Sequence, residues 1–403
     1  MTPLIKPDDY TTLWALIILG TGAAIWLEQK YKWAARLSGP VIALLISMAL
    51  SNTGIVPSES PAYDFVGTWL IPLAIPLLLF RANVVQIFRT TGRLFICFHI
   101  SSVGSILGTG LAIAALRGRI QSPGLEQAGG IMAASYVGGS VNFFAVAQNY
   151  RVPGNITNPL IVADNFVMAG AFVVLLSLAT SPFFRKRYPH PHTLEASSSA
   201  AENVAAHHWQ RKGISLLDIA KSLSFAFVVV GLAALLGRGA QSLFSPGPGS
   251  GMLFQMLQTL CTNKYVLLTA TSLVLATLLH KPLKEVNGPD EIGIYLLYLF
   301  LFVIGLPADL RTVLLQAPLF FLFCGIIAVV NLCFTLVIGK IFKLPLEELL
   351  LSVNANLGGA PSAAAMAISC GWSRLVLPGI LIGIWGYVIG TPIGIMVVEF
   401  FKR

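Results

Sequence analysis

Long apolar runs separated by short polar connectors follow one another along almost the whole chain. Each run is close to the length of about 20 residues that a helix needs to cross the hydrocarbon core of a bilayer. In the first half we predict spans at 12–27, 37–50, 64–80, 94–116, 128–148 and 157–182. In the second half we predict them at 215–236, 264–280, 292–307, 318–340, 347–369 and 375–399. The pattern predicts an all-α polytopic membrane protein with about 12 transmembrane helices.

Two of these runs contain a Gly-Gly pair near the middle. The first pair is Gly138-Gly139 and the second is Gly358-Gly359. Glycine costs a helix interior about 1 kcal/mol relative to alanine. In lipid, a broken helix is tolerated only where it is buried in protein or lines a cavity. Matching interruptions in the two halves of a membrane protein indicate the binding site of a secondary transporter.

The two glycine pairs belong to a longer internal similarity, with an offset of 220 positions (138 to 358). We therefore predict a first repeat at 1–182, a polar linker at 183–214 and a second repeat at 215–403. Lysine and arginine favour the cytoplasmic side of a membrane. Their distribution places the connector 81–93 inside and its counterpart 307–317 outside, which predicts inverted repeats. This orientation requires one further crossing between 183 and 263, or one span fewer.

Composition limits the class of protein further. The chain is 56% hydrophobic and 11% charged, whereas soluble domains carry about 25% charged residues. Its net charge of +9 comes from bases in short loops, so the sequence predicts contact with lipid and no nucleic-acid partner. The five cysteines lie in or beside apolar runs without metal-ligand spacing, which indicates packing residues rather than a disulfide framework.

Polar side chains flank both glycine pairs within the apolar runs. Because a broken helix exposes unpaired backbone groups and dipole ends, these side chains would complete a binding site for a polar solute. Pro361 removes a backbone donor within the second break. The competing interpretation is close packing of helices on small residues, which explains glycine and alanine better than it explains asparagine. The candidate binding residues are Tyr136, Gly138, Gly139, Ser140, Asn142, Asn354, Asn356, Gly358, Gly359, Pro361 and Ser362.

Asp164, followed by Asn165, is the clearest acid inside an apolar span. An ionisable residue within a membrane is costly and indicates a functional site. Asp164 could bind a proton or a cation, and a structural pairing is the alternative. His99 is also within a span, where a lone histidine is more often a packing residue than a proton relay.

No enzyme motif was found in the sequence. Metalloprotease, intramembrane aspartyl protease, nucleophile-elbow and phosphate-loop patterns are all absent from it. We therefore expect no enzyme activity and no cofactor other than a coupling ion, Na⁺ or H⁺. Transport driven by an ion gradient is the simplest mechanism.

The span plan, the two Gly-Gly breaks and the run from Phe302 to Leu310 resemble the YjcL-like family of integral membrane proteins. That family is similar to the cation–proton antiporter and anion transporter superfamily, which includes the bile-acid/sodium and glutamate/sodium symporters. The resemblance implies two crossing discontinuous helices, as in sodium–proton antiporters, an elevator motion and a homodimer. It also implies ion binding at Asp164, where antiporters carry an acidic pair, with Asn165 in place of the second acid. A Na⁺ site near Asp164 and Asn356 would match the symporters.

The first hypothesis is a secondary transporter of a small polar or anionic organic solute, coupled to Na⁺ or H⁺, in the bacterial inner (cytoplasmic) membrane. The second is a monovalent cation/proton antiporter. A third, of another class, is a membrane regulator or scaffold that transports nothing. The sequence leaves open the substrate, the coupling ion, symport or antiport, and the oligomeric state.

Overall fold

The computed structural model describes residues 3–31, 34, 39–120, 122–192, 213–243, 252–307 and 310–402. Helices make up nearly all of the regular structure in these residues, and one isolated β-bridge joins Arg117 to Ile120. Of the predicted linker, only 183–192 and 213–214 are among the residues described. The fold is therefore all-α, as predicted, wherever the chain is described.

The first half contains the helices that surround the first glycine break. Their bounds are α1 Tyr10–Lys30, α3 Gly39–Asn52, α4 Pro61–Phe65, α5 Ile71–Leu78, α6 Val84–Thr91, α7 Arg93–Leu116, α8 Gly124–Gly138, α9 Ser140–Asn149, α10 Gly154–Thr180 and α11 Pro182–Arg185. Between α4 and α5 the backbone forms a π-helical turn, η1, at Val66–Leu70. Each of the six predicted spans of this half falls on helical structure.

The second half contains the helices that surround the second glycine break. Its bounds are α13 Leu216–Leu243, α14 Met252–Thr262, α15 Lys264–Leu278, α16 His280–Lys284, α17 Pro289–Gly305, α18 Leu310–Ile341, α19 Leu346–Ser369 and α20 Ser373–Phe401. The predicted spans of this half also fall on helices. Within the stretch 183–263, where the orientation requires a further crossing, α14 is a short helix of 11 residues.

Seven helical segments among the described residues are long and apolar enough to cross a membrane. They include α1, α7, α10, α13 and α20, together with Pro61–Leu78 and Ala317–Ile341. Two further apolar helices, Val41–Asn52 and Lys264–Leu278, are shorter. The break after α8 leaves two pieces that are each too short to span alone. The arrangement of 12 spans in two inverted repeats stays a prediction.

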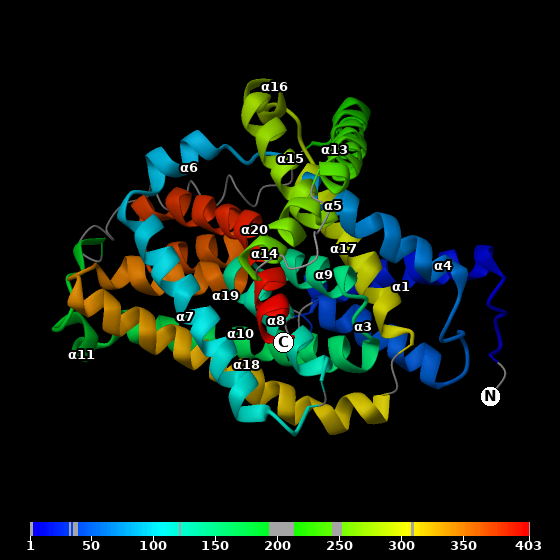
Figure 1. The fold of residues 1–403 in the computed structure, drawn as a ribbon, viewed down its shortest axis with the longest axis horizontal. Coiled ribbons are helices and arrows are strands. Elements are labelled where there is room, and N and C mark those ends of the chain that lie inside the picture. The colour runs from blue at the N-terminus through cyan, green and yellow to red at the C-terminus, as the bar shows by residue number, and fades with distance from the viewer. Residues whose placement is uncertain are drawn as a thin grey trace.

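The helices form two packed groups (Figure 1). In one group, α7, α8, α10, α18, α19 and α20 lie side by side and pack on one another. In the other, α17 packs on α3 and α5, and α13 packs on α5 and α15. Both glycine breaks belong to the first group, so this group positions the candidate site.

The crossing of α7 with α18 depends on two glycines one helical turn apart. A Cβ atom added to Gly104 would lie 3.0 Å from the Cα atom of Asn331, and one added to Gly108 would lie 2.9 Å from the Cα atom of Ile327. The close backbones bring polar side chains into contact: Ser101 donates to the Asn331 side chain at 2.7 Å, and Asn331 donates to Ser105 at 2.7 Å. Small residues with hydrogen bonds between them are the usual way in which helices pack in membranes.

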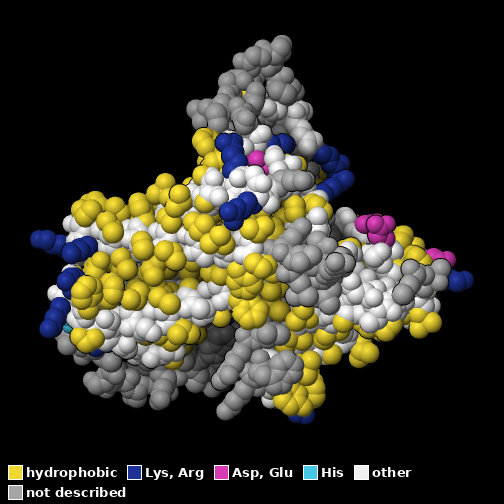
Figure 2. All heavy atoms as spheres, turned by 90° about the horizontal axis from the view of Figure 1, so that it is seen from below, with side chains coloured by type: hydrophobic (Ala, Val, Ile, Leu, Met, Phe, Trp, Pro, Cys, Tyr) yellow, Lys and Arg dark blue, Asp and Glu magenta, His cyan; other side chains and the backbone are white. Residues whose placement is uncertain are grey.

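The surface of the molecule carries broad apolar areas. Figure 2 shows hydrophobic side chains spread over the middle of one face, with lysine and arginine gathered toward its edges. On α13 the side chains of Phe227, Val228 and Leu235 are more than half exposed, and on α18 those of Val329 and Val337 are as well. A soluble monomer rarely exposes such a continuous apolar area. The surface is that of a protein solvated by lipid.

Candidate functional site

The first predicted break is present in the structure. Helix α8 ends at Gly138, Gly139 has φ 72° and ψ −179°, and α9 begins at Ser140. This backbone conformation is almost restricted to glycine. The Gly139 amide still donates to the Ser135 carbonyl at 2.6 Å, and the Asn142 amide donates to the Gly139 carbonyl at 3.0 Å. The interruption is therefore confined to one residue, at the position that the sequence indicates.

The second break has nearly the same geometry. Within α19, Gly359 has φ 72° and ψ −166° and interrupts the helix, and Pro361 follows it. Asn354 and Ser362 bridge the break, because the Asn354 side chain donates to the Ser362 carbonyl at 2.7 Å and accepts from the Ser362 hydroxyl at 2.9 Å. The two interruptions predicted from the glycine pairs are thus both confirmed.

The two breaks meet. A Cβ atom added to Gly139 would lie 3.7 Å from the Cα atom and 3.9 Å from the nitrogen of Gly359. The ring of Tyr387, on α20, packs against both glycines, at 3.4 Å from the added Cβ of Gly139 and 3.2 Å from that of Gly359. We call this point, formed by Gly139, Gly359 and Tyr387, the glycine junction. Four half-helices therefore end at one place in the interior.

A row of glycines on α20 allows this approach. Side chains at Gly383, Gly386 and Gly390 would collide with α19 or α8: Gly383 lies against the backbone of Ala360, and a Cβ atom on Gly386 would lie 2.6 Å from the Val137 carbonyl oxygen. The offset of 220 positions pairs Gly170 with Gly390, yet a Cβ atom added to Gly170 would have no neighbour within 4 Å. The two helices that follow the breaks therefore contact them differently.

Asn142 ties the first break to α20. Its amide group donates to the Gly138 carbonyl at 2.6 Å and to the Gly386 carbonyl at 3.4 Å. Its side-chain oxygen accepts from the backbone and the hydroxyl of Thr391, at 2.9 and 2.6 Å. All of its hydrogen-bonding groups are in use, so in this conformation Asn142 holds the break and has nothing left to offer a solute.

Asn356 has the corresponding role in the second break. Its amide donates to the carbonyls of Phe98 and Ser352, at 3.2 and 3.0 Å, and its oxygen accepts from the Ser102 hydroxyl at 2.9 Å. These bonds attach α19 to α7. Asn356 and Asp164 form no hydrogen bond with each other, so a shared Na⁺ site at these two residues stays a prediction.

Asp164 lies beside the first break in a buried and incompletely bonded position. Its side chain is on α10, and the residue is 5% exposed. One carboxylate oxygen accepts from the Ser135 hydroxyl at 3.1 Å, whereas the other, Oδ1, has no partner with hydrogen-bond geometry among the described residues. The Tyr136 hydroxyl, also without such a partner, and the Cys324 thiol lie next to this carboxylate. No arginine or lysine pairs with Asp164 in the described chain.

One face of α10 touches both breaks. Asp164 contacts Ser135, just before the first break, and Met168 lies one turn further along. A Cβ atom added to Gly358 would lie 3.4 Å from the Met168 sulfur. Asn165, next to Asp164, donates back to the Ile161 carbonyl at 2.8 Å within the helix. A change at the Asp164 carboxylate would therefore occur one helical turn from Met168, the residue that contacts the second break.

The dipoles of four half-helices meet at the glycine junction. Helix α9 and the second half of α19 point their N-terminal ends at it, and α8 and the first half of α19 point their C-terminal ends. N-terminal ends attract negative charge and C-terminal ends attract positive charge. Ser140 and Pro361 are exposed here, Ser362 is partly exposed, and Gly139 and Tyr136 are buried. The arrangement can hold an anionic group and a cation close together.

Close contacts fill the centre of the junction, where the Tyr387 ring lies against both glycines. Two pockets elsewhere in the described chain contain no residue of the breaks. One, of about 410 Å³, lies around Pro7, Asn52 and Glu59, and the other, of about 300 Å³, lies between η1, α13 and α15.

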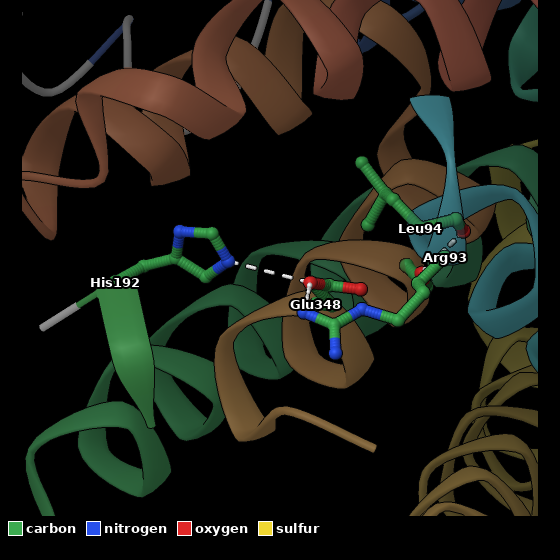
Figure 3. Close-up of polar contacts among 5 residues, drawn as sticks. Arg93, Leu94, His192 and Glu348 are labelled. Carbon is green, nitrogen blue, oxygen red and sulfur yellow. Dashed lines mark hydrogen bonds and ion pairs between the residues drawn. The ribbon is translucent and has the colours of Figure 1, made fainter. Parts of the chain in front are cut away.

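A charged cluster at the start of α19 was not anticipated from the sequence. Glu348, with a side chain 5% exposed, accepts from Arg93 on α7 and faces His192, each at 3.3 Å (Figure 3). The neighbouring Glu347 is also buried. Two adjacent glutamates, Glu347 and Glu348, in the first turn of an apolar helix were the available signal. The cluster joins the outer end of the broken helix α19 to the start of α7.

His99 is a packing residue, as the sequence analysis favoured. Its Nδ1–H donates to the Phe95 carbonyl at 2.8 Å, and its Nε2 accepts from the Trp385 indole at 3.2 Å. This pair of bonds requires the neutral ring. The ring also lies among Phe95, Phe98 and Trp385.

Known proteins resemble this chain over its whole length. The curated relative "Uncharacterized membrane protein YjcL" of Bacillus subtilis (strain 168) is 42% identical over 403 residues, which is 100% of this chain and 99% of that relative. Its name agrees with the membrane-spanning helices of the structure. A family described as "Protein of unknown function (DUF819)" matches residues 15–403. The chain belongs to this DUF819 family of membrane proteins.

Proposed function

We propose that the protein is a secondary active transporter of a small polar or anionic organic solute, coupled to Na⁺ or H⁺, in the bacterial inner membrane. The observation that carries the proposal is the glycine junction, where Gly139 and Gly359 adopt the same unusual conformation and touch. A purely structural role requires no such pair of breaks. In membrane transporters, facing discontinuous helices form the sites for solute and coupling ion.

The solute site belongs at the N-terminal ends of the two second half-helices. Ser140 and Pro361 are the exposed residues of the two breaks, and Ser362 is partly exposed. Unpaired backbone N–H groups at a helix N-terminus form a ready anion site. The Tyr387 ring lies between the two ends. A carboxylate or another anionic group of a small organic solute is the chemistry that fits these ends best.

The coupling ion belongs at Asp164. A buried carboxylate without a positive partner is unfavourable by several kcal/mol unless it is neutralised. A proton or a Na⁺ ion would satisfy Oδ1, with Ser135 and Tyr136 as neighbouring oxygen groups. Because α10 also contacts Gly358 through Met168, occupancy of Asp164 can favour one arrangement of the second break.

The resemblance to the cation–proton antiporter and anion transporter superfamily supports an elevator motion of the helix group that holds the junction. Hydrogen bonds between the two helix groups are sparse among the described residues, which fits such a motion. One is the hydrogen bond from the Asn263 side chain, at the start of α15, to the Asn149 side chain at the end of α9, at 2.8 Å. Another is the bond from Asn158 to the Ile304 carbonyl, at 3.1 Å. A homodimer is part of the same proposal.

A monovalent cation/proton antiporter is the second candidate. The observation that favours it is the unpartnered Asp164 oxygen, which needs a cation or a proton but not a solute. Exchange of a proton for a cation at this single carboxylate would suffice. Acidification or alkalinisation of vesicles that contain only Na⁺ or K⁺ would identify this activity.

A membrane regulator or scaffold is the candidate of another class, and the close contact of Tyr387 with both break glycines favours it. A thermal-shift screen of the purified protein with cations and small organic anions separates it from a transporter, because a specific ligand stabilises the state that it binds. A transporter predicts that one cation and one anion class raise the melting temperature, and that Asp164→Asn abolishes the cation effect. The next measurement would be uptake of the stabilising anion into proteoliposomes, driven by an ion gradient. Stabilisation by no ligand in the screen, with intact fold, would contradict the transport proposal.

A further inference from the structure

A second site lies far from the glycine junction, in the pocket between η1, α13 and α15. The pocket has a volume of about 300 Å³. Its polar lining comes from Thr68, Trp69, Arg238, Gln241, Thr262 and Lys264. No acidic residue lines it. The question is which ligand such a pocket on the surface of a membrane protein would hold.

The two cations of the pocket have no acidic partner among the described residues. Neither Arg238 nor Lys264 forms an ion pair within the part of the chain that the structure describes. Arg238 lies near the C-terminal end of the apolar helix α13, and Lys264 is the first residue of α15. Basic residues at the ends of apolar helices lie at the level of the lipid headgroups. An anion at this level is therefore attracted by two uncompensated charges.

Much of the pocket lining is apolar. Pro72, Val230 and Leu268 belong to it, together with Ala233 and Ala234. A ligand with an anionic head and an apolar tail matches this division, whereas a free inorganic anion would leave the apolar part unused.

The backbone at the pocket is unusual. Thr68 and Trp69 belong to the π-helical turn η1, which interrupts an otherwise α-helical segment from Pro61 to Leu78. Such turns are rare and often occur at functional sites. Here the turn places Thr68 and Trp69, which is 41% exposed, in the pocket lining. Tryptophan at the interface of a membrane commonly contacts lipid headgroups.

We propose that this pocket binds the headgroup of an anionic phospholipid, with Arg238 and Lys264 on the phosphate and the acyl chains along α13. The site is independent of the transport proposal, because it shares no residue with the glycine junction. It ties α13 and α15 to the π-helical turn that leads into α5. The lipid would thus stabilise the second helix group.

Trp69 makes the site testable by fluorescence. The full-length protein is placed in phosphatidylcholine nanodiscs that contain brominated phosphatidylglycerol or, at equal mole fraction, brominated phosphatidylcholine. Bromine quenches a tryptophan that it touches, and the part of the quenching that Trp69→Phe removes reports on this pocket. We expect stronger quenching of Trp69 by the phosphatidylglycerol.

The charge variants decide the outcome. Arg238→Gln and Lys264→Gln should each reduce the preference for phosphatidylglycerol about fivefold, and together they should abolish it. Lys284→Gln with Lys340→Gln, at exposed positions outside the pocket, should leave it unchanged. Equal quenching by the two lipids overturns the proposal, as does a preference that survives in the folded double variant. Quenching by neither lipid, as expected if a second copy of the chain covered the pocket, overturns it too.

Discussion

Gly139 and Gly359 touch where the two broken helices meet, with 3.7 Å between a Cβ atom added to the first and the Cα atom of the second. Both have φ 72°, a conformation that other residues adopt only with strain. The repetition of one backbone geometry at two positions in contact is the basis of the functional proposal.

Replacing either glycine with alanine should destabilise the protein. Gly139→Ala and Gly359→Ala force a side chain into the left-handed region, at a cost of about 1–3 kcal/mol each. The added methyl groups would also press on the Tyr387 ring. The measurement is the melting temperature of the purified protein. Gly170→Ala is the matched control: its position is helical with no neighbour within 4 Å, so it should be neutral or stabilising by up to about 1 kcal/mol. Equal melting temperatures for the three variants would contradict this prediction.

Asn142 should be needed for stability rather than for direct contact with a solute. Asn142→Ala removes the bonds to Gly138 and Thr391 in the interior. Leaving such buried groups unpaired costs about 1–3 kcal/mol, which a lower melting temperature would report. Ser140→Ala, at an exposed position, should leave the melting temperature unchanged. A stable Asn142→Ala protein with weakened ligand binding would instead assign Asn142 to the solute site.

Arg93 should stabilise the start of α19 through Glu348. Arg93→Gln leaves the buried Glu348 carboxylate with His192 as its remaining ion-pair partner among the described residues. The Arg93 side chain is 61% exposed, so we expect a loss of about 1–2 kcal/mol rather than the larger cost of breaking a fully buried pair. Arg89→Gln, on the exposed side of α6, is the control and should have no effect on thermal unfolding. Equal stability of the two variants would show that the ion pair contributes nothing measurable.

Local signals in the sequence predicted the breaks well. A Gly-Gly pair inside an apolar run restricts the local backbone, so Gly139 and Gly359 could be identified without knowledge of their neighbours. Asp164 could be identified in the same way, because an acid in an apolar run is itself unusual. Helix positions followed from the length of the apolar runs.

Contacts between distant segments could not be predicted in this way. An asparagine side chain both donates and accepts hydrogen bonds, so the sequence suggested that Asn142 and Asn356 contact a solute. In the structure their side chains bond to residues of α20 and α7. The regular spacing of glycines along α20 is visible in the sequence. The residues that these glycines contact depend on how α20 packs against α8 and α19. The buried Glu348 was missed because glutamate in the first turn of a helix is usually exposed.

The electric current that follows a sudden change in cation concentration tests the ion site most directly, because this measurement requires no knowledge of the solute. Proteoliposomes on a solid-supported membrane are exposed to a step in Na⁺ concentration or in pH, and the transient current is recorded. The account predicts a current in the original protein for one of these ions and none in Asp164→Asn. Asp9→Asn, at an exposed helix start, and His99→Gln should retain it. An unchanged current in Asp164→Asn, or none in the original protein for either ion, would contradict the claim that Asp164 binds the coupling ion.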